Sequence, residues 1–97
     1  MAKRKIIWSD EAKKSFGEIL DFYIQRNGNK RYSQELSKQL KKIISYLQKS
    51  NYLGKQTNEE NTRVLIKGNY LIFYEIQDAS IEILLIWDSR RNPDKLK

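Results

Sequence analysis

Three strand-like runs follow one another between Thr62 and Trp87, and this succession constrains the fold more than any other feature of the chain. The first two runs meet at Gly68-Asn69, a dipeptide that fits a two-residue β-hairpin turn. In that register, three residues before the turn lie opposite three residues after it on one face of the sheet: Arg63, Leu65 and Lys67 opposite Tyr74, Ile72 and Tyr70. The sequence therefore predicts an antiparallel hairpin whose Tyr70, Ile72 and Tyr74 contact the rest of the protein.

The last run, Ile81 to Trp87, is apolar at almost every position. Strict alternation places Ile81, Ile83, Leu85 and Trp87 on one face, and Leu84 and Ile86 on the other. A strand that is apolar on both faces is normally covered on both. Because two helices are too few for that, we expect a partner chain to pack across Leu84 and Ile86 or to extend the sheet edge.

The upstream half of the chain predicts one short strand and two amphipathic helices. Lys5 to Trp8 is rich in β-branched and aromatic residues, as strands are. Ser9 fits a helix N-cap, apolar residues at helical spacing follow it, and Gly28 fits a left-handed C-cap. A second helix is predicted from about Lys30 to Lys49, and the polar segment from Asn51 to Asn61 is expected to be a loop.

Ninety-seven residues are enough for one domain with a modest core, so we expect a single domain over residues 1–97. The predicted order β-α-α-β-β-β belongs to the α+β class, with two N-terminal helices packed on a mainly antiparallel sheet of about four strands. No apolar run approaches the roughly 20 residues that a membrane helix needs. We therefore expect a cytoplasmic protein.

The charge balance and two missing residue types limit the possible chemistry. Lysine and arginine outnumber the acids 19 to 12, which gives a net charge of +7. This excess favours a polyanion or an acidic protein as partner, although solubility alone is an alternative explanation. Without cysteine there is no thiolate zinc site, and without histidine any catalysis must use other groups. We expect no metal and no cofactor.

The candidate site residues gather at the hairpin and at the end of the last strand. Arg90 and Arg91 follow that strand, where a pair of guanidinium groups is suited to bind phosphate or carboxylate. We predict that they form one catalytic or target-binding site with Arg63, Lys67 and Asp88. Simpler roles are a surface ion pair for Arg63 and a cap of the strand end for Asp88.

Four segments occur in a characteristic order along the chain: Trp8–Ala12 before the first helix, Arg63, Gly68–Tyr74 in the hairpin, and Ile86–Arg91 at the end of the last strand. Together they resemble the RelE/ParE superfamily of bacterial toxins over nearly the whole chain. The resemblance implies the toxin of a type II toxin–antitoxin module, a class that includes plasmid stabilisation systems. It also implies a cognate acidic antitoxin as partner.

Two activities are open under this resemblance. RelE-like members act as mRNA interferases in the ribosomal A site, whereas ParE-like members bind DNA gyrase. RNA cleavage needs cations for the phosphate, a base such as a lysine or the carboxylate of Glu75 or Asp88, and an acid such as a tyrosine with a lowered pKa. Leu71 stands where RelE-like nucleases typically place an arginine, and no tyrosine or histidine follows Arg91. Outside this family, a non-toxic basic module that binds nucleic acid is the alternative.

Overall fold

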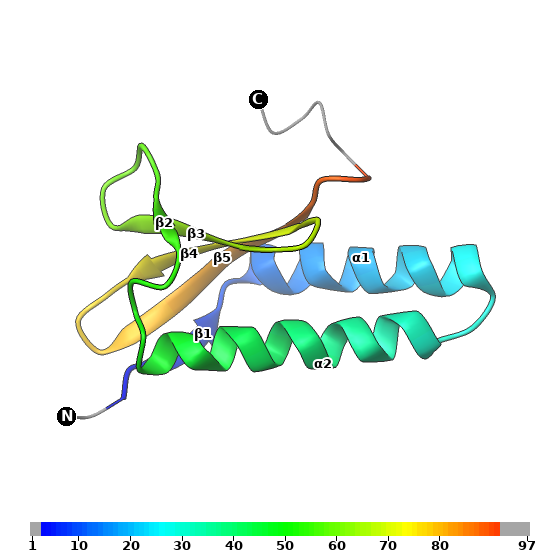
Figure 1. The fold of residues 1–97 in the computed structure, drawn as a ribbon, viewed down its shortest axis with the longest axis horizontal. Coiled ribbons are helices and arrows are strands. Elements are labelled where there is room, and N and C mark those ends of the chain that lie inside the picture. The colour runs from blue at the N-terminus through cyan, green and yellow to red at the C-terminus, as the bar shows by residue number, and fades with distance from the viewer. Residues whose placement is uncertain (1–2, 92–97) are drawn as a thin grey trace.

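A single sheet and a helical hairpin make up the computed structural model, which describes residues 3–91 (Figure 1). The elements follow in the order β1 (Lys5–Trp8), α1 (Asp10–Asn27), α2 (Arg31–Ser45), a 3₁₀ turn η1 (Tyr46–Gln48), β2 (Lys55–Gln56), β3 (Thr62–Lys67), β4 (Tyr70–Ile76) and β5 (Ser80–Asp88). The strand order is β1-β5-β4-β3-β2, and β1 runs parallel to β5 while the other neighbours are antiparallel. The α+β class is confirmed, with five strands in place of about four.

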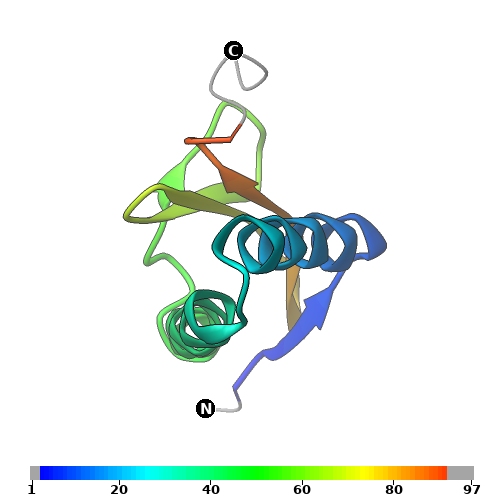
Figure 2. The same cartoon turned by 90° about the vertical axis from the view of Figure 1, so that its right-hand side faces the viewer.

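The two helices begin and end largely as predicted. The Ser9 hydroxyl accepts a hydrogen bond from the Ala12 amide at 3.0 Å, and Gly28 ends α1 with a φ of 73°. The second helix is shorter than predicted, because α2 ends at Ser45 and η1 continues it. Both helices pack against the same face of the sheet, which curves around them (Figure 2).

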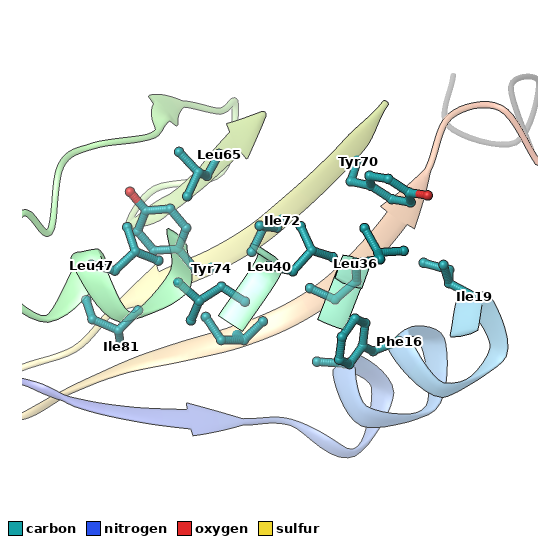
Figure 3. Packing of buried hydrophobic residues seen from close by; sticks show 14 of the residues in the cluster. Phe16, Ile19, Leu36, Leu40, Leu47, Leu65, Tyr70, Ile72, Tyr74 and Ile81 are labelled. Carbon is teal, nitrogen blue, oxygen red and sulfur yellow. The ribbon is translucent and has the colours of Figure 1, made fainter. Parts of the chain in front are cut away.

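The hairpin register is confirmed, and it decides which face is buried. Gly68 takes the first central position of the turn with a φ of 59°, as a type II′ turn requires. Tyr70, Ile72 and Tyr74 are buried, and Figure 3 shows them in the core with side chains of both helices. The predicted face of β4 is therefore the one that contacts the helices.

One residue of β5, Leu84, has no partner across β4. Phe73 pairs with Leu85, but the next residue, Tyr74, pairs with Ile83, which is a β-bulge. The bulge shifts the alternation of side chains, so the strict alternation predicted for this strand is wrong beyond Ile83. Three isoleucines of β5 are consequently buried in the core: Ile81, Ile83 and Ile86.

The opposite face of the sheet is apolar and is left partly exposed by residues 3–91. We call it the outer apolar face. Paired positions on β3, β4 and β5 place six side chains in two rows on it: Val64, Phe73 and Leu85 in one, and Ile66, Leu71 and Trp87 in the other. All six are half-buried or exposed, and Ile66 is 50% exposed. The expectation of an apolar second face is met, although β5 contributes Leu85 and Trp87 to it in place of Leu84 and Ile86.

The segment between α2 and β3 is anchored to the core by Tyr74. The Tyr74 hydroxyl donates to the Asn51 carbonyl at 2.8 Å and accepts from the Gly54 amide at 2.9 Å. This contact leads the chain into β2, which pairs with Arg63 and Val64 and which the polar sequence of the segment did not reveal. Gly54 lies so close to β3 that a Cβ atom on it would stand 2.6 Å from the Val64 carbonyl oxygen.

Replacing Gly54 by alanine should destabilise the protein by about 1–3 kcal/mol, because the added methyl group meets backbone that cannot move aside. The matched control is Gly17→Ala in α1, where a Cβ meets nothing within 4 Å. That change should raise the free energy of unfolding by roughly 0.5–1 kcal/mol. Chemical denaturation of both variants checks the pair, and equal effects of the two substitutions would contradict this packing.

Candidate functional site

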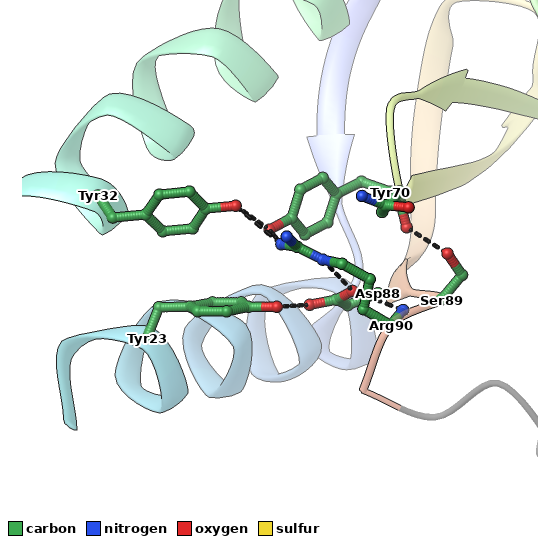
Figure 4. A network of polar contacts seen from close by, with 7 residues as sticks. Tyr23, Tyr32, Tyr70, Asp88, Ser89 and Arg90 are labelled. Atoms are coloured by element: carbon green, nitrogen blue, oxygen red, sulfur yellow. Dashed lines mark hydrogen bonds and ion pairs between the residues drawn. The ribbon is translucent and has the colours of Figure 1, made fainter. Parts of the chain in front are cut away.

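Five side chains from both helices and the end of the sheet meet where β5 ends (Figure 4). We call them the tyrosine–arginine cluster: Tyr23 of α1, Tyr32 of α2, Tyr70 of β4, Asp88 of β5, and Arg90 just beyond β5. The turn after β5 is held in place by Ser89, whose amide and hydroxyl both donate to the Asn69 carbonyl at 2.9 Å. The ends of β4 and β5 and the two helices that pack beside them thus bring all five groups into one connected cluster.

Asp88 is the buried charge of this cluster. Its side chain has no exposed surface and accepts from the Tyr23 hydroxyl at 2.7 Å and from the Arg90 amide at 2.9 Å. The Arg90 Nε lies 3.6 Å from the same carboxylate. A carboxylate removed from water needs such partners, since an unpaired buried charge is strongly destabilising. The capping role that the sequence offered for Asp88 is thus present in the structure.

Arg90 is held on its other side by two phenols. Its Nη2 donates to the Tyr32 hydroxyl at 2.8 Å and to the Tyr70 hydroxyl at 2.6 Å, and these two oxygens lie 2.7 Å apart. The guanidinium carbon also lies 5.1 Å from the ring centroid of Tyr23 and 5.5 Å from that of Tyr70. This guanidinium therefore joins the chain beyond β5 to both helices.

The protonation states of the cluster follow from burial and from these bonds. Burial raises the pKa of Tyr23, and its hydrogen bond to the Asp88 carboxylate raises it further. Burial and the bond to Tyr32 likewise raise the pKa of Tyr70. The pKa of Arg90 is raised chiefly by its hydrogen bond to Tyr32. At neutral pH both tyrosines are neutral and hold their protons more tightly than a free phenol does.

The structure separates the cations that were predicted to form one site. Lys67 and Arg90 line the same hollow, between α2 and the β3–β4 turn. Arg63 lies four residues before Lys67 on β3, about 13 Å away at the rise of a strand. Arg91 lies over the ring of Phe22, with 4.7 Å from its guanidinium carbon to the ring centroid. Arg63 is therefore separated from Lys67 and Arg90 by most of the length of β3.

Arg63 is bound to the segment before β3. It donates to the Gly54 carbonyl at 2.9 Å, to the Gln56 side chain at 3.0 Å and to the Tyr52 carbonyl at 3.4 Å. Its guanidinium also lies over the ring of Tyr52 at 5.3 Å. Arg63 holds this segment against the sheet, and it does so through carbonyl groups, whereas the sequence suggested an ion pair with an acidic residue.

The two residues predicted to meet an antitoxin differ in accessibility. Ile86 is 1% exposed and belongs to the core, so it offers no surface to a partner in this structure. Leu84, at the bulge, is half-buried. The physical reason is again the bulge, which turns Ile86 toward the helices and brings Leu85 and Trp87 to the outer apolar face.

Three members of the cluster, Tyr23, Tyr32 and Tyr70, were not among the predicted site residues, although Tyr70 was expected to face the helices. The sequence carried one usable signal for Tyr23, which stands on the apolar face of the first helix. A phenol on a buried face needs a polar partner for its hydroxyl, and a carboxylate after a strand is a candidate. Tyr32 gave no such signal, because its role depends on how the two helices cross the end of the sheet.

Residues 3–91 contain no group of three or more histidine, cysteine, aspartate or glutamate side chains placed to hold a metal ion. In the same range, no helix combines the length and the apolarity needed to cross a membrane.

Replacing Tyr23 by phenylalanine should lower the free energy of unfolding by about 1–3 kcal/mol at pH 7, because Asp88 stays buried with one donor fewer. Since the pKa of Tyr23 is raised above 10.0, its contribution is complete below pH 10 and is lost as the pH rises through the raised value. Urea unfolding from pH 7 to 12 should therefore show a weaker alkaline loss of stability in this variant. Tyr46→Phe, at a 52% exposed position, should behave as wild type at every pH.

Comparisons with known proteins agree with this architecture. The family model described as "ParE toxin of type II toxin-antitoxin system, parDE" matches residues 6–93. A solved structure from the chromosomal ParDE toxin–antitoxin system of P. aeruginosa is similar, with a TM-score of 0.76 and 17% identity, over 87% of this chain and 94% of that one. A chain of the E. coli DinJ-YafQ toxin–antitoxin complex has a TM-score of 0.57 and 12% identity, over 92% of this chain and 96% of that one.

A search among curated protein sequences finds no match. At these low identities the two solved structures establish the fold, and the family model establishes the family. The resemblance to the RelE/ParE superfamily is thereby confirmed, and it favours a toxin over a stand-alone module that binds nucleic acid. The chain belongs to the ParE toxin family of type II toxin–antitoxin systems.

Proposed function

We propose that this toxin arrests growth by binding and inhibiting DNA gyrase, and that it does not cleave mRNA. The observation that carries the proposal is the tyrosine–arginine cluster, which uses for folding the groups that RNA cleavage would require. Membership in the ParE family points the same way, since the ParE-like branch of the superfamily is the one that binds gyrase.

The candidate groups for RNA cleavage are engaged or far apart. Asp88 is buried and bonded on both oxygens, so it is not accessible to a 2′-hydroxyl group. Tyr70 has a raised pKa, whereas a general acid near neutral pH needs a lowered one. The other candidate carboxylate, Glu75, pairs with Thr62 at the opposite end of β4 from Arg90. Within residues 3–91, these candidates do not combine into a base, an acid and a phosphate-binding cation around one point.

Gyrase inhibition requires a binding surface and no proton transfer. Arg90, Arg91 and Lys67 lie near the end of β5 and the hairpin turn, with Arg90 partly exposed at its side chain. Surface cations beside aromatic rings are common anchors of protein interfaces. We place the target-binding surface at this end of the molecule, acting in the cytoplasm where both gyrase and the ribosome are found.

The partner that neutralises the toxin is a cognate antitoxin, and the outer apolar face is the surface that we assign to it. Six apolar side chains lie partly exposed on this face, and the chain carries a net charge of +7. An acidic chain with apolar side chains at alternate positions complements both properties. Covering this face removes apolar surface from water, which stabilises the complex by roughly 25 cal/mol for each Å² buried.

Induction of the toxin in bacteria should stop DNA synthesis before protein synthesis, as measured by pulse incorporation of labelled thymidine and leucine. The purified protein should inhibit DNA supercoiling by gyrase and leave mRNA intact on translating ribosomes. Arg91→Ala should weaken gyrase inhibition about tenfold, because an interface arginine is lost while Arg90 keeps the fold. Early loss of translation, with cuts in mRNA at the A site, would contradict the proposal.

Replacing Ile66 by aspartate should weaken antitoxin binding by about 10- to 100-fold, since a charge is placed on the outer apolar face beside Leu71. It should also reduce any self-association of the isolated toxin. Leu53→Asp is the matched control, because Leu53 is 48% exposed and lies outside the sheet face. Isothermal titration calorimetry with the cognate antitoxin measures the affinity of each variant. Equal affinities for the two variants would place the antitoxin on another surface.

A further inference from the structure

The hollow beside Arg90 has a composition that the toxin activity does not explain. It measures about 220 Å³ and lies between α2 and the β3–β4 turn. Its polar lining consists chiefly of Tyr32, Glu35, Gln39, Lys67, Tyr70 and Arg90. Figure 4 shows Tyr32, Tyr70 and Arg90 converging on one point from three different segments. A hollow of this size accommodates one side chain or a small ion.

Where Tyr32, Tyr70 and Arg90 meet, hydrogen-bond donors outnumber acceptors. Arg90 has five N–H groups, of which the two on Nη2 bind the tyrosine hydroxyls and the one on Nε faces Asp88. The two N–H groups on Nη1 have no acceptor among residues 3–91. The hydroxyls of Tyr32 and Tyr70 share one hydrogen bond, so one of their two protons has no acceptor in that range either.

The charges around the hollow indicate which acceptor fits. Lys67 is exposed and adds a second cation to that of Arg90. Two carboxylates oppose them, Asp88 beneath Arg90 and Glu35 at the wall, where Gln39 donates to it at 3.4 Å. The two cations and the two carboxylates cancel, so a polyanion such as a nucleic-acid backbone is disfavoured next to Glu35, and the unused donors of Arg90 and Lys67 favour one small acceptor such as a single carboxylate. The unused N–H groups of Arg90 are both on Nη1, so this nitrogen is placed to bind one oxygen of a carboxylate, and the Lys67 ammonium in the same hollow is placed to bind the other.

The hollow adjoins the outer apolar face. Lys67 follows Ile66 on β3, and Tyr70 precedes Leu71 on β4, so the hollow lies one residue nearer the turn than the row of Ile66, Leu71 and Trp87 and on the helix side of the sheet. A chain that crosses the outer apolar face along β3 and β4 and passes around the two-residue turn therefore brings its next residues to the hollow. Successive residues of an extended chain alternate in direction, which places an acidic side chain within reach of Arg90 and Lys67.

We propose that this hollow binds the carboxylate of one aspartate or glutamate side chain of the antitoxin. The guanidinium Nη1 of Arg90, the free hydroxyl proton of the Tyr32–Tyr70 pair and the Lys67 ammonium are its ligands. The identity of the partner rests on the proposed function, whereas the anion site itself rests on the donors. Binding there fixes the position of the antitoxin along the outer apolar face and covers the cations at the end of β5.

The anion site is tested with acetate as the probe. Acetate at constant ionic strength should raise the melting temperature of the toxin more than chloride does, in a saturable way. Tyr32→Phe, which removes one hydroxyl, and Lys67→Ala should each weaken acetate binding about tenfold. Tyr46→Phe and Lys14→Ala remove the same groups at exposed positions outside the hollow and should respond as wild type. An equal response of all five proteins would overturn the site, and so would stronger protection by inorganic phosphate than by acetate.

The partner is tested with the antitoxin encoded beside the toxin. Lys67→Ala and Tyr32→Phe should each weaken its binding about tenfold, and alanine at one acidic residue of the antitoxin should cause no further loss in the Lys67→Ala background. If acetate protects the toxin but neither variant changes antitoxin affinity, the assignment to the antitoxin is wrong. If the antitoxin does not bind the wild-type toxin at all, its role in the proposed function fails, and the acetate measurement still decides the anion site separately.

Discussion

The burial of the Asp88 carboxylate is the constraint on which this end of the molecule depends. A buried charge that loses a partner destabilises a protein by about 3–5 kcal/mol, so its neighbours are not free to vary. The need for a cation brings Arg90 back over the end of β5, and the need for a second donor places the Tyr23 hydroxyl on α1. Tyr32 and Tyr70 then accept from the guanidinium and tie it to α2 and β4. The chain beyond β5 is thus attached to both layers of the fold.

Some charged groups that were candidates for binding a target instead hold the fold together. Arg63 and Arg90 were attractive as ligands for a target, yet each is bound to backbone or side-chain oxygens of its own chain. What is left for partners is of two kinds. One is the outer apolar face, which the helices do not cover, and the other is the set of donors around the hollow beside Lys67. Under the proposed function both serve binding, and neither requires proton transfer.

The sequence predicted those parts of the fold that depend on interactions between residues close together in the chain. The Gly68-Asn69 turn determined the register of the hairpin and thereby the buried face of β4, and Ser9 and Gly28 marked the ends of α1. The bulge at Leu84 was not predictable, because two apolar residues in succession give no signal of which one lacks a partner. The strand β2 was missed for a different reason, since it is stabilised by Tyr74 and Arg63 from elsewhere in the chain. The cluster of Tyr23, Tyr32 and Arg90 likewise depends on contacts across more than 50 residues.

The measurement that tests this account most directly is a double-mutant cycle between Tyr32 and Arg90, read as free energies of unfolding of Tyr32→Phe, Arg90→Met and the double variant. If Arg90 is a structural link held by the phenol, the two residues should be coupled by about 1–3 kcal/mol, as is typical for a hydrogen bond to a charged group. A coupling energy within roughly 0.3 kcal/mol of zero would contradict it, because Arg90 would then be an independent surface cation.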